Sequence, residues 1–403
     1  MNRILFVNVI DSTNPVHTRF HPLTFGYLVS YCHASNEPFQ YAYTEKLDTD
    51  CLKKNQPNVV AMTTVTENYS LAKTYSGIIK KFNPNIKVII GGVHISAVPL
   101  SLGRNMDAGV IGEGEQTFLE LLKNSFEGAE KIKGIVYRKN DALHVTEDRK
   151  LIEPLDLIPH PKRDMFGDQE RNHYLFTSRG CAYRCVFCFS SRFWKKVRFH
   201  SPEYVAAEIK QINQLFKVSH INIQDDTFIL DVERVRKIKE LVKDLGLTYT
   251  IGARANLITE EVVTTLKDMG VTMVGMGFES NSQRILDYLC KGNTVEDNQR
   301  AVDILYKHEI GVAGSFIRNV PIETSEDLKL TYDFIRRNRI PHDMYRLMRY
   351  PGTPLYDGNE DWDSYRVYCY EPKMMKLRKR LFKVKPLRLL YRSTRTLVRR
   401  IKK

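Results

Sequence analysis

Three cysteines within eight residues carry the clearest chemical signal in this 403-residue sequence. Cys181, Cys185 and Cys188 have the spacing C-x3-C-x2-C. Thiolates are soft ligands that suit iron–sulfur clusters, copper(I) and zinc. A 4Fe–4S cluster normally takes four ligands, so three cysteines on one loop would leave one iron open to a cofactor or a substrate. The spacing therefore predicts a cluster with one vacant coordination position.

The residues alone leave open two alternatives to a cluster at these cysteines. A structural zinc ion takes four ligands, and the fourth would have to be a histidine such as His173 or His200, since no fourth cysteine is near. The three residues could also be unrelated core cysteines. We expect a single cluster, because the remaining cysteines are scattered along the chain: Cys32, Cys51, Cys290 and Cys369.

The cysteines follow the first strand of a βα series that covers residues 171–356. Apolar, β-branched runs alternate there with helical patterns such as 202–216 and 232–245. Six such units predict a barrel or partial barrel, in which chemistry gathers at the carboxyl ends of the strands. The expected strands are 173–177, 220–224, 247–251, 271–278, 311–317 and 344–349.

Residues 1–146 form a second α/β pattern. It predicts a Rossmann-like, doubly wound parallel sheet closed by a hairpin at 134–138 and 142–146. Glycines follow two of the strands, where they let the backbone come close to a ligand at the sheet edge: Gly91, Gly92, Gly112 and Gly114. The expected strands are 4–10, 59–65, 87–92 and 108–111, and the clearest helices are 68–82 and 115–123.

The composition excludes several classes of protein. Seven cysteines, an odd number, argue against a secreted disulfide framework and for a reducing, cytoplasmic compartment. No stretch approaches eighteen uncharged apolar residues, so we expect no membrane-spanning helix. The first residues have the pattern of a strand rather than of a signal peptide. Prolines punctuate residues 147–170, which we expect to be a linker.

The net charge of +14 comes from residues 373–403, in the C-terminal tail that we expect over 357–403. Within it, residues 373–403 contain 14 Lys or Arg and no acidic residue, and the rest of the chain carries 47 basic against 47 acidic residues. A neutral body argues against a nucleic-acid partner. Apolar residues recur at helical spacing in the tail, which favours basic amphipathic helices on the inner, anionic surface of a membrane. A solvated or docked tail and RNA binding are the alternatives.

The cysteine loop resembles the hallmark of the radical S-adenosylmethionine (SAM) enzymes. The spacing, with Phe187 before the last cysteine, matches that superfamily, and residues 170–355 are similar to its core domain. The resemblance implies that Cys181, Cys185 and Cys188 hold a 4Fe–4S cluster whose open iron chelates SAM. An electron then cleaves SAM to methionine and a 5′-deoxyadenosyl radical, which abstracts hydrogen from the substrate.

The same resemblance implies roles for polar residues at the strand ends. Asp225 and Asp226 would contact the SAM amino group, for which carboxylates are suitable acceptors; a solvated loop or a helix N-cap is the alternative. Glu279 and Ser280 match the segment that contacts the ribose, although Ser280 could instead cap the next helix. Arg254 would reach SAM or the substrate, or lie on the surface.

Three segments are similar to one subgroup, the cobalamin-binding (class B) radical SAM enzymes. YPGTPLY at 350–356 resembles the end of its core domain, while GGVH at 91–94 and GEGE at 112–115 recur at strand ends that hold the cobalamin tail and corrin edge. The motif D-x-H-x-x-G, which supplies a lower axial histidine, is absent. Cobalamin without a histidine ligand is therefore implied, with an empty vestigial fold as the rival. We expect His94 to be a satisfied loop histidine and not a ligand of cobalt.

The subgroup usually shows G-x-P-x-E-T after the fifth strand of the barrel. Residues 319–324 of this chain resemble it, but Asn319 stands where glycine is expected. Asparagine tolerates a positive φ better than most residues do. The departure from the pattern is therefore mild.

We expect a cytoplasmic radical SAM enzyme whose two domains face each other across the substrate. The implied cofactors are a 4Fe–4S cluster, SAM and cobalamin, and an external electron donor such as flavodoxin or ferredoxin. The expected reaction is methylation of an unactivated carbon in a small or lipid-like molecule, with cyclisation, oxidation or rearrangement as the alternative. A tRNA methylthiotransferase would need three further cysteines in the first domain, where only Cys32 and Cys51 exist. A non-catalytic scaffold is the remaining rival.

Overall fold

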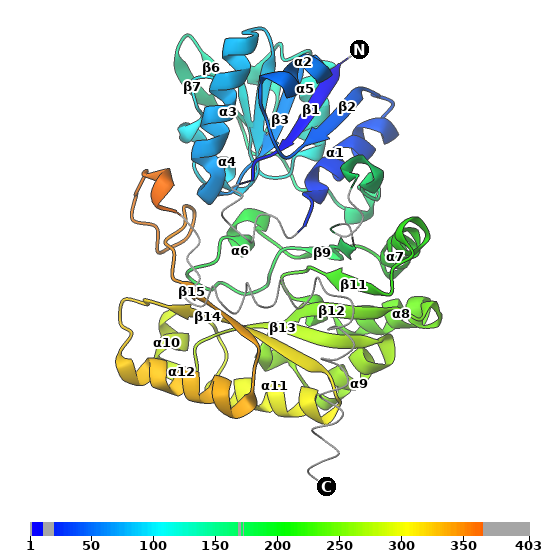
Figure 1. The fold of residues 1–403 in the computed structure, drawn as a ribbon, viewed down its shortest axis with the longest axis vertical. Helices are drawn as coiled ribbons and strands as arrows, with labels where there is room; N and C mark the ends of the chain where they lie inside the picture. The colour runs from blue at the N-terminus through cyan, green and yellow to red at the C-terminus, as the bar shows by residue number, and fades with distance from the viewer. Residues whose placement is uncertain (1, 11–19, 168–170, 172, 366–403) are drawn as a thin grey trace.

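The computed structural model describes residues 2–10, 20–167, 171 and 173–365. They form two α/β domains, one above the other in Figure 1, with a loop and a short helix, α6 (Ser190–Trp194), between them. Each domain is built on a predominantly parallel sheet. The predicted fold class, a Rossmann-like sheet followed by a partial barrel, is therefore confirmed.

The sheet of the first domain has the strand order β2-β1-β3-β4-β5-β6-β7. Strands β1 to β5 run parallel, and β6 and β7 close the sheet as the predicted antiparallel hairpin. The strands are β1 (Arg3–Asn8), β2 (Gln40–Thr44), β3 (Val59–Thr63), β4 (Lys87–Gly91), β5 (Ala108–Val110), β6 (Ile135–Lys139) and β7 (Ala142–Val145). The helices are α1 (Leu23–Ala34), α2 (Thr49–Asn55), α3 (Tyr69–Phe82), α4 (Val93–Ala97) and α5 (Glu115–Lys123).

Alternating side chains of the buried strands supply two cores, one on each face of this sheet. Ile4 and Phe6 of β1 face α1 and α5, whereas Leu5 and Val7 face α2 and α3. Strand β2 escapes prediction because it is an edge strand, half-buried and rich in polar and tyrosine side chains, and carries no continuous apolar run. The strand order reverses its direction between β1 and β3, and the carboxyl ends beside such a point are where doubly wound sheets bind ligands.

The second domain is an open sheet of six parallel strands in the order β8-β11-β12-β13-β14-β15. All six predicted strands are present, with ends displaced by one to a few residues. The strands are β8 (Tyr174–Leu175), β11 (His220–Ile223), β12 (Thr248–Ala253), β13 (Val271–Glu279), β14 (Gly311–Arg318) and β15 (His342–Arg346). The helices outside it are α7 (Pro202–Phe216), α8 (Val232–Val242), α9 (Glu260–Met269), α10 (Gln283–Tyr288), α11 (Val295–Lys307) and α12 (Ser325–Asn338).

Helices of the partial barrel begin at capping residues, which accept hydrogen bonds from backbone N–H groups of the first turn. Ser201 accepts a hydrogen bond from the Tyr204 backbone N–H at the start of α7, and Asp231 accepts one from the Arg234 N–H at α8. Residues Val274, Met276 and Phe278 of β13 pack against the helices. The side chains at the intervening positions of the central strands point to the inner side of the barrel.

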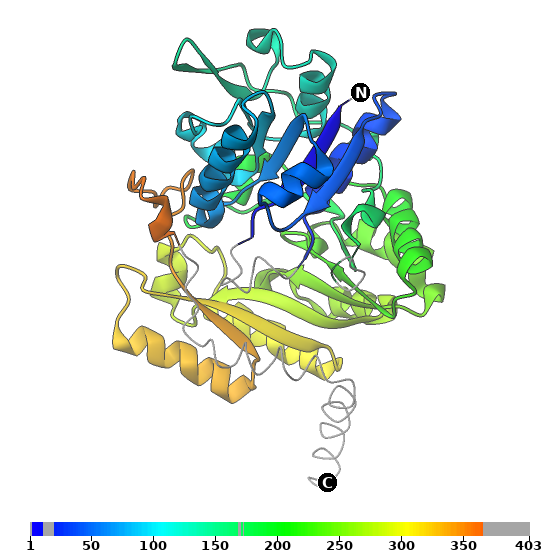
Figure 2. The same cartoon turned by 45° about the horizontal axis from the view of Figure 1, so that its top comes forward.

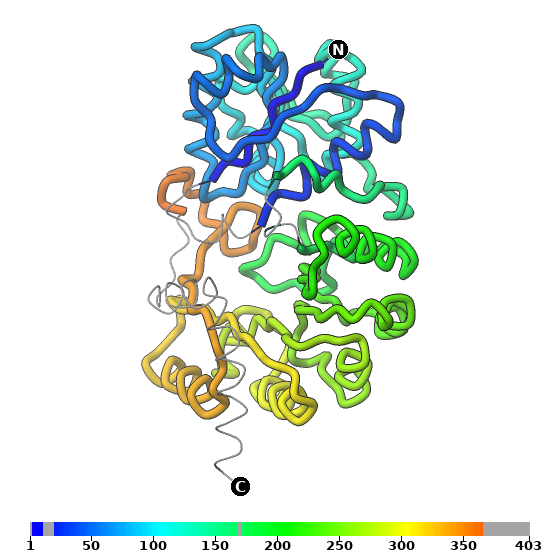
Figure 3. The backbone as a smooth tube through the Cα atoms, turned by 45° about the vertical axis from the view of Figure 1, so that its right-hand side comes forward, coloured from blue at the N-terminus to red at the C-terminus, as the bar shows by residue number. Residues whose placement is uncertain are grey.

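Two connecting segments bind the domains together. In the predicted linker, Ile152, Leu155, Ile158 and Phe166 are buried in the core of the first domain. After β15 the chain returns to the first domain, where Trp362 and Tyr365 pack beside α3; Figures 2 and 3 show this orange segment against the upper domain. The amphipathic stripes of 373–403 and Cys369 lie outside the described residues.

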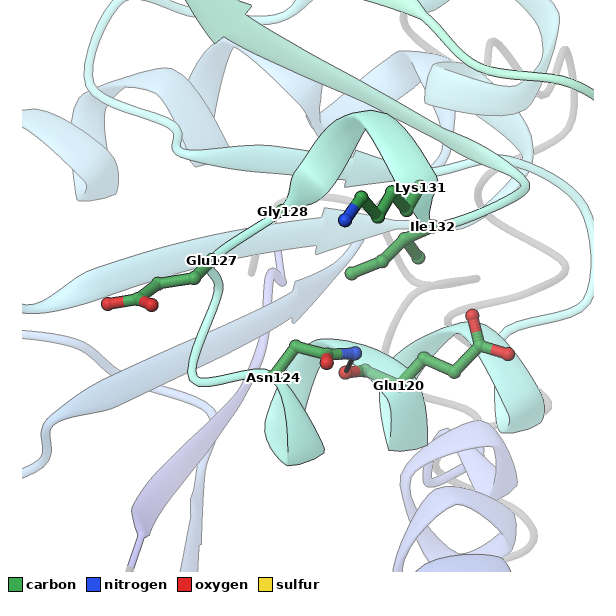
Figure 4. A pocket seen from close by; sticks show the side chains of 6 residues that line it. All are labelled: Glu120, Asn124, Glu127, Gly128, Lys131 and Ile132. Atoms are coloured by element: carbon green, nitrogen blue, oxygen red, sulfur yellow. Dashed lines mark hydrogen bonds between the residues drawn. The ribbon is translucent and has the colours of Figure 1, made fainter.

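No helix of the described part of the chain is long and apolar enough to cross a membrane. One hollow of about 310 Å³ lies on the outside of the first domain, at the last turn of α5. Figure 4 shows that polar side chains from α5 and the following turn line it. It lies at the other end of α5 from Glu115, the residue that contacts the second domain.

Candidate active site

The three motif cysteines lie on one closed loop, residues 180–197, between two short strands. β9 (Ser178–Arg179) and β10 (Arg198–Phe199) pair antiparallel and form the neck of this cluster loop. Gly180 starts the loop with a φ of +102°, and a Cβ there would stand 2.5 Å from the Lys196 carbonyl oxygen. Only glycine lets the two sides of the neck come so close.

The three thiols lie close enough together to interact electrostatically. Cys185 is buried, and Cys181 and Cys188 are half-buried. Burial raises the pKa of Cys188 to about 11, and the nearby charges of Asp226, Cys185 and Cys181 act in the same direction. Arg192 donates to the carbonyl oxygens of Cys188 at 2.7 Å and Cys185 at 3.2 Å, which fixes the turn that carries both. Without a metal the Cys188 thiol stays protonated; bound iron would hold it as a thiolate.

The described residues contain no group of three His, Cys, Asp or Glu side chains placed to hold a single metal ion. The thiolates of a cubane bind different irons, so they stand further apart than the ligands of one ion. The histidines considered as zinc ligands are engaged elsewhere. His200 is buried, forms a hydrogen bond of 2.9 Å with Asp156 and stacks on Tyr204, and His173 precedes β8 at the opposite end of the barrel strand.

Arg254 is buried beside the cluster loop, so its surface alternative is wrong. Its Nη1 donates to the Cys185 Sγ at 3.5 Å, and its Nη2 donates to the Lys291 carbonyl oxygen. Its guanidinium lies 3.5 Å from the ring centroid of Tyr183. Its Nε is buried without a hydrogen-bond partner among the described residues. A cation with an unused donor suits a site that takes an anionic cluster.

The two neighbouring carboxylates after β11 have different surroundings. Asp225 is buried and accepts four hydrogen bonds, from the backbone N–H and the hydroxyl of both Thr177 and Ser178. Asp226 is exposed, lies close enough to Cys181 and Cys188 to interact with them electrostatically, and accepts from the Ser190 hydroxyl. Burial raises the pKa of Asp225, and desolvation by neighbouring atoms raises the pKa of Asp226. Neither residue caps a helix, since α8 begins at Asp231.

Glu279 and Ser280 lie at the carboxyl end of β13. Glu279 is buried with a φ of +61° and accepts from the Lys291 Nζ at 2.8 Å. A Cβ at Gly277 would contact both side chains, which places this ion pair on the inner side of the barrel. Ser280 contacts the Thr331 hydroxyl at 3.1 Å. Ser282 occupies the N-cap position of α10, so the capping alternative for Ser280 is wrong.

Asn319 has a left-handed backbone, with a φ of +62°. Its N–H donates to the Glu323 Oε2 at 2.9 Å. The substitution of asparagine for glycine therefore keeps the conformation of this strand end.

The glycines of the first domain lie at the carboxyl ends of β4 and β5, facing the second domain. Gly92 has a φ of +101°, and a Cβ there would collide with the Thr64 backbone. Gly112 has a φ of +75° and open space where a Cβ would be. Gly91 and Gly114 have ordinary backbone conformations, and Gly114 precedes α5. The sheet edge is thus open at Gly112 and closed by strand packing at Gly92.

His94 is a satisfied core histidine, as expected. Its two ring nitrogens contact the Thr66 hydroxyl at 3.2 Å and the Ser101 hydroxyl at 3.1 Å. The ring stacks on Tyr69 and meets the edge of Trp362. Burial lowers the pKa of His94 to about 3, so the ring is neutral in the folded protein.

A hollow of about 340 Å³ lies where the two domains face each other. The first domain contributes the residues after β3 and Val93 of α4, and the second contributes α6 and the segment after β15. The Tyr350 hydroxyl donates to the Glu67 Oε1 at 2.6 Å across this boundary. Its lining residues are Val65, Thr66, Glu67, Val93, Phe189, Ser190, Phe193, Trp194, Tyr350 and Pro351.

Sequence patterns do not reveal the buried ion-pair network that joins the domains. Glu113 accepts from Arg179 at 2.5 Å and from Arg198 at 2.9 and 3.0 Å, and Glu115 accepts from Arg179 at 2.6 Å. The glycines of the motif GEGE indicate a ligand edge but say nothing of its acidic residues. The sequence signal for the network is the pair of acidic residues Glu113 and Glu115 at the end of a strand, together with Arg179 directly before Gly180 and Cys181. Sequence patterns also do not identify Lys291, the partner of Glu279.

Comparisons with known proteins agree with this arrangement. The model of the radical SAM superfamily matches residues 175–335, and the model of the B12 binding domain matches residues 25–122. An uncharacterized methyltransferase of Pyrococcus horikoshii is 35% identical over 321 residues, which cover 76% of this chain and 70% of that protein. The chain belongs to the cobalamin-binding (class B) radical SAM family.

Further relatives of this radical SAM enzyme have different reactions in their names. The anaerobic magnesium-protoporphyrin IX monomethyl ester cyclase of Rubrivivax gelatinosus is 28% identical, with 92% of this chain and 72% of that protein covered. The solved structure of TsrM from Kitasatospora setae has a TM-score of 0.72 at 18% identity, covering 88% of this chain and 74% of that one. The cobalamin-dependent enzyme OxsB has a TM-score of 0.71 at 19% identity, covering 94% of this chain and 56% of that one. These two structures confirm the fold.

The described residues fit the cofactors of the family, which are a 4Fe–4S cluster, SAM and cobalamin. Cys181, Cys185 and Cys188 converge as three soft ligands, and Arg254 offers them a cation. Gly112 leaves space at the open edge of the first sheet. No histidine in the described residues of that edge is free to bind cobalt, because His94 is fully engaged. Radical SAM enzymes need an electron donor and act on small molecules.

Proposed function

We propose that this radical SAM enzyme transfers a methyl group to an unactivated carbon of a small molecule. The observation that carries the proposal is the contact between the base of the cysteine loop, at Arg179, and Glu113 of the turn that follows the first sheet, with a mostly apolar hollow between the domains. When bound, the cluster and SAM supply a radical that removes a hydrogen atom, and cobalamin supplies the methyl group that replaces it. The methyltransferase relative at 35% identity supports this reaction over cyclisation.

The residues of the chain have separate tasks in this proposal. Cys181, Cys185 and Cys188 would hold the cluster, and Arg254 donates to one of them, Cys185. Asp226 would accept from the SAM ammonium group, since it is the exposed carboxylate of the pair. Asp225 holds the strand end that leads into the cluster loop.

The strand ends of the two sheets would hold the remaining parts of the cofactors. Glu279 and Ser280 lie at the carboxyl end of β13, where the ribose of SAM is expected, and Lys291 is at hand for its carboxylate. Gly91, Gly92, Gly112 and Gly114 line the edge that faces cobalamin. We place the domain boundaries at 1–146 and 171–356, with 147–170 between them and 357–403 as the tail.

The hollow between the domains selects for an apolar substrate. Phe193 and Trp194 of α6 and Phe189 just before it line the hollow, together with Val65 and Val93 of the first domain. These side chains exclude water, which would otherwise react with a radical. The Glu67–Tyr350 pair is the polar contact on this wall that could orient a substrate group.

Anaerobic reconstitution tests the proposal. The protein with iron, sulfide, hydroxocobalamin, SAM and dithionite should form 5′-deoxyadenosine, whereas the triple variant Cys181→Ala/Cys185→Ala/Cys188→Ala should form none. Hydroxocobalamin should remain bound through gel filtration in both proteins. Absence of corrin absorbance would remove the methylation proposal, and absence of 5′-deoxyadenosine would leave a non-catalytic scaffold.

We propose flavodoxin or ferredoxin as the electron donor, and contact of the tail with the inner membrane surface. Tyr365, the last described residue, packs on the first domain and stacks on Tyr350, which lines the hollow that would receive a lipid-like substrate. Fourteen basic residues favour an anionic surface. Flotation with phosphatidylglycerol vesicles should fall when 373–403 are deleted; equal flotation would refute membrane contact.

A further inference from the structure

The neck of the cluster loop is held by a carboxylate from the other domain. Glu113 lies on the turn between Gly112 and Gly114, directly after β5, and is 7% exposed. Its Oε1 accepts from Arg179 at 2.5 Å and from Arg198 at 3.0 Å, and its Oε2 accepts from Arg198 at 2.9 Å and from the Ile152 backbone N–H at 2.9 Å. Both lone-pair sites of each oxygen are therefore used.

The two arginines lie on opposite strands of the neck. Arg179 and Arg198 are register partners in the β9–β10 ladder, immediately before and after the loop of residues 180–197. Arg179 is one residue from Gly180 and two from Cys181. A single buried carboxylate thus bridges both ends of the loop that carries the cluster ligands.

The same arginines position an aromatic wall of the interdomain hollow. Their guanidinium groups lie 5.3 and 5.8 Å from the ring centroid of Trp194, which ends α6 and lines the hollow. Removal of the Glu113 carboxylate would leave Arg198 buried without a carboxylate partner, while Arg179 would keep its ion pair with Glu115. An unpaired buried charge is strongly destabilising, so the Arg198 side of the neck would rearrange and the two sides would lose their shared acceptor.

We propose that Glu113 is a positioning residue that couples cobalamin binding to the cluster loop. The proposal rests on the proposed function, because it takes cobalamin at the edge that Gly112 leaves open. A ligand against the turn at 112–114 favours the turn conformation in which Glu113 reaches both arginines. That conformation closes the neck at Gly180. By linkage, a loop closed around its cluster favours cobalamin to the same extent.

The coupling is measurable as a ratio of two affinities. Hydroxocobalamin is titrated into the full chain with a reconstituted cluster and into the Cys181→Ala/Cys185→Ala/Cys188→Ala variant, and corrin absorbance gives each Kd. In the wild-type background the cluster should strengthen binding about 5- to 20-fold, in the lower part of the roughly 5- to 150-fold range usual for site–site coupling. E113Q should bring the ratio to about one while the affinity of the cluster-free protein stays within about threefold.

E120Q is the matched control. Glu120 lies on α5 of the first domain and accepts from both Nη groups of an arginine, Arg149 of the connecting segment, but this pair does not reach the second domain. This variant should keep the wild-type ratio. A ratio unchanged in E113Q, or an equal loss of affinity with and without the cluster, would overturn the coupling.

Hydrogen exchange tests the clamp without any cofactor. Amides of residues 180–197 should exchange at least about tenfold faster in E113Q than in wild type or E120Q, and E113D should restore part of the protection. Equal exchange would overturn the proposal. If E113Q fails to fold, Arg198→Lys tests the same neck, since lysine keeps the charge and loses the two-pronged contact. If E113Q shows the faster exchange but wild type binds no cobalamin, the clamp stands and the proposed function fails.

Discussion

Replacing each of the adjacent carboxylates Asp225 and Asp226 by asparagine should lower a different property: stability and bound iron for Asp225, and affinity for SAM for Asp226. Asp225→Asn removes the charge that accepts four hydrogen bonds from Thr177 and Ser178. The amide oxygen can keep the two backbone N–H donors, while the amide nitrogen faces two hydroxyls. A hydrogen bond to a charged group contributes about 1.5–3 kcal/mol against about 1 for a neutral one. With partial recovery by hydroxyl rotation, we expect a loss of about 2–3 kcal/mol.

That loss corresponds to a fall in Tm of roughly 5–10 °C for a domain of about 200 residues. Because Asp225 holds the strand end before the cluster loop, bound iron should fall with it. Asp226→Asn removes only the contact with Ser190 and should leave Tm and iron unchanged, but lower SAM affinity about tenfold, equal to about 1.4 kcal/mol. Calorimetric melting, iron content and equilibrium binding of SAM separate the two. Weaker SAM binding by D225N with normal Tm and iron would refute the assignment.

Four further outcomes follow from single contacts. Burial lowers the pKa of His94 to about 3 and that of His200 to about 4, so the unfolded chain takes up two more protons than the folded chain below pH 6.5. The free energy of unfolding is therefore unaffected above that pH and should fall by about 3 kcal/mol at about pH 5.5. His94→Gln should halve the slope of the free energy of unfolding against pH, measured by urea titrations. Gly180→Ala places a Cβ against the Lys196 carbonyl and should abolish iron retention, whereas Gly246→Ala, with positive φ and open space, should lose only about 1 kcal/mol of stability and no iron. Tyr350→Phe removes a bond to Glu67 and should lower the free energy of unfolding by about 1 kcal/mol, measured by denaturant titration. Arg254→Gln removes a cation and a donor from Cys185, and should shift the cluster midpoint potential to a more negative value in EPR-monitored titrations.

The elements that sequence patterns place well are those with one clear periodicity. α7 has the expected bounds because Ser201 and Pro202 mark its start and an apolar stripe fills it. Strands β11, β12, β13 and β14 are identifiable because each contains β-branched residues, whereas β8 and β15 contain none and are marked only by apolar and aromatic residues. Edge strand β2 lacks an apolar run, so no local pattern marks it.

The roles of individual site residues depend on distance in space, which no spacing reveals. Asp225 and Asp226 are equivalent in the sequence, yet one is enclosed by Thr177 and Ser178 and the other is exposed. Arg254 could not be distinguished from a surface arginine, because its contacts with Cys185 and Lys291 join separate segments of the chain. The cysteines were identifiable because all three ligands lie on one loop.

The cluster loop takes its form from its surroundings more than from itself. It contains one helix of five residues, and its apolar members Val186 and Phe187 pack on a small cluster around Leu289 rather than on each other. Arg254 reaches it from the barrel, Asp225 fixes the strand before it, and Glu113 of the other domain closes its neck. Each of these contacts joins charged or polar groups that burial makes expensive to leave unpaired. A loop held in this way by both domains can keep three thiols in place without a core of its own, and it ties the geometry of the cluster to the position of the sheet that faces it.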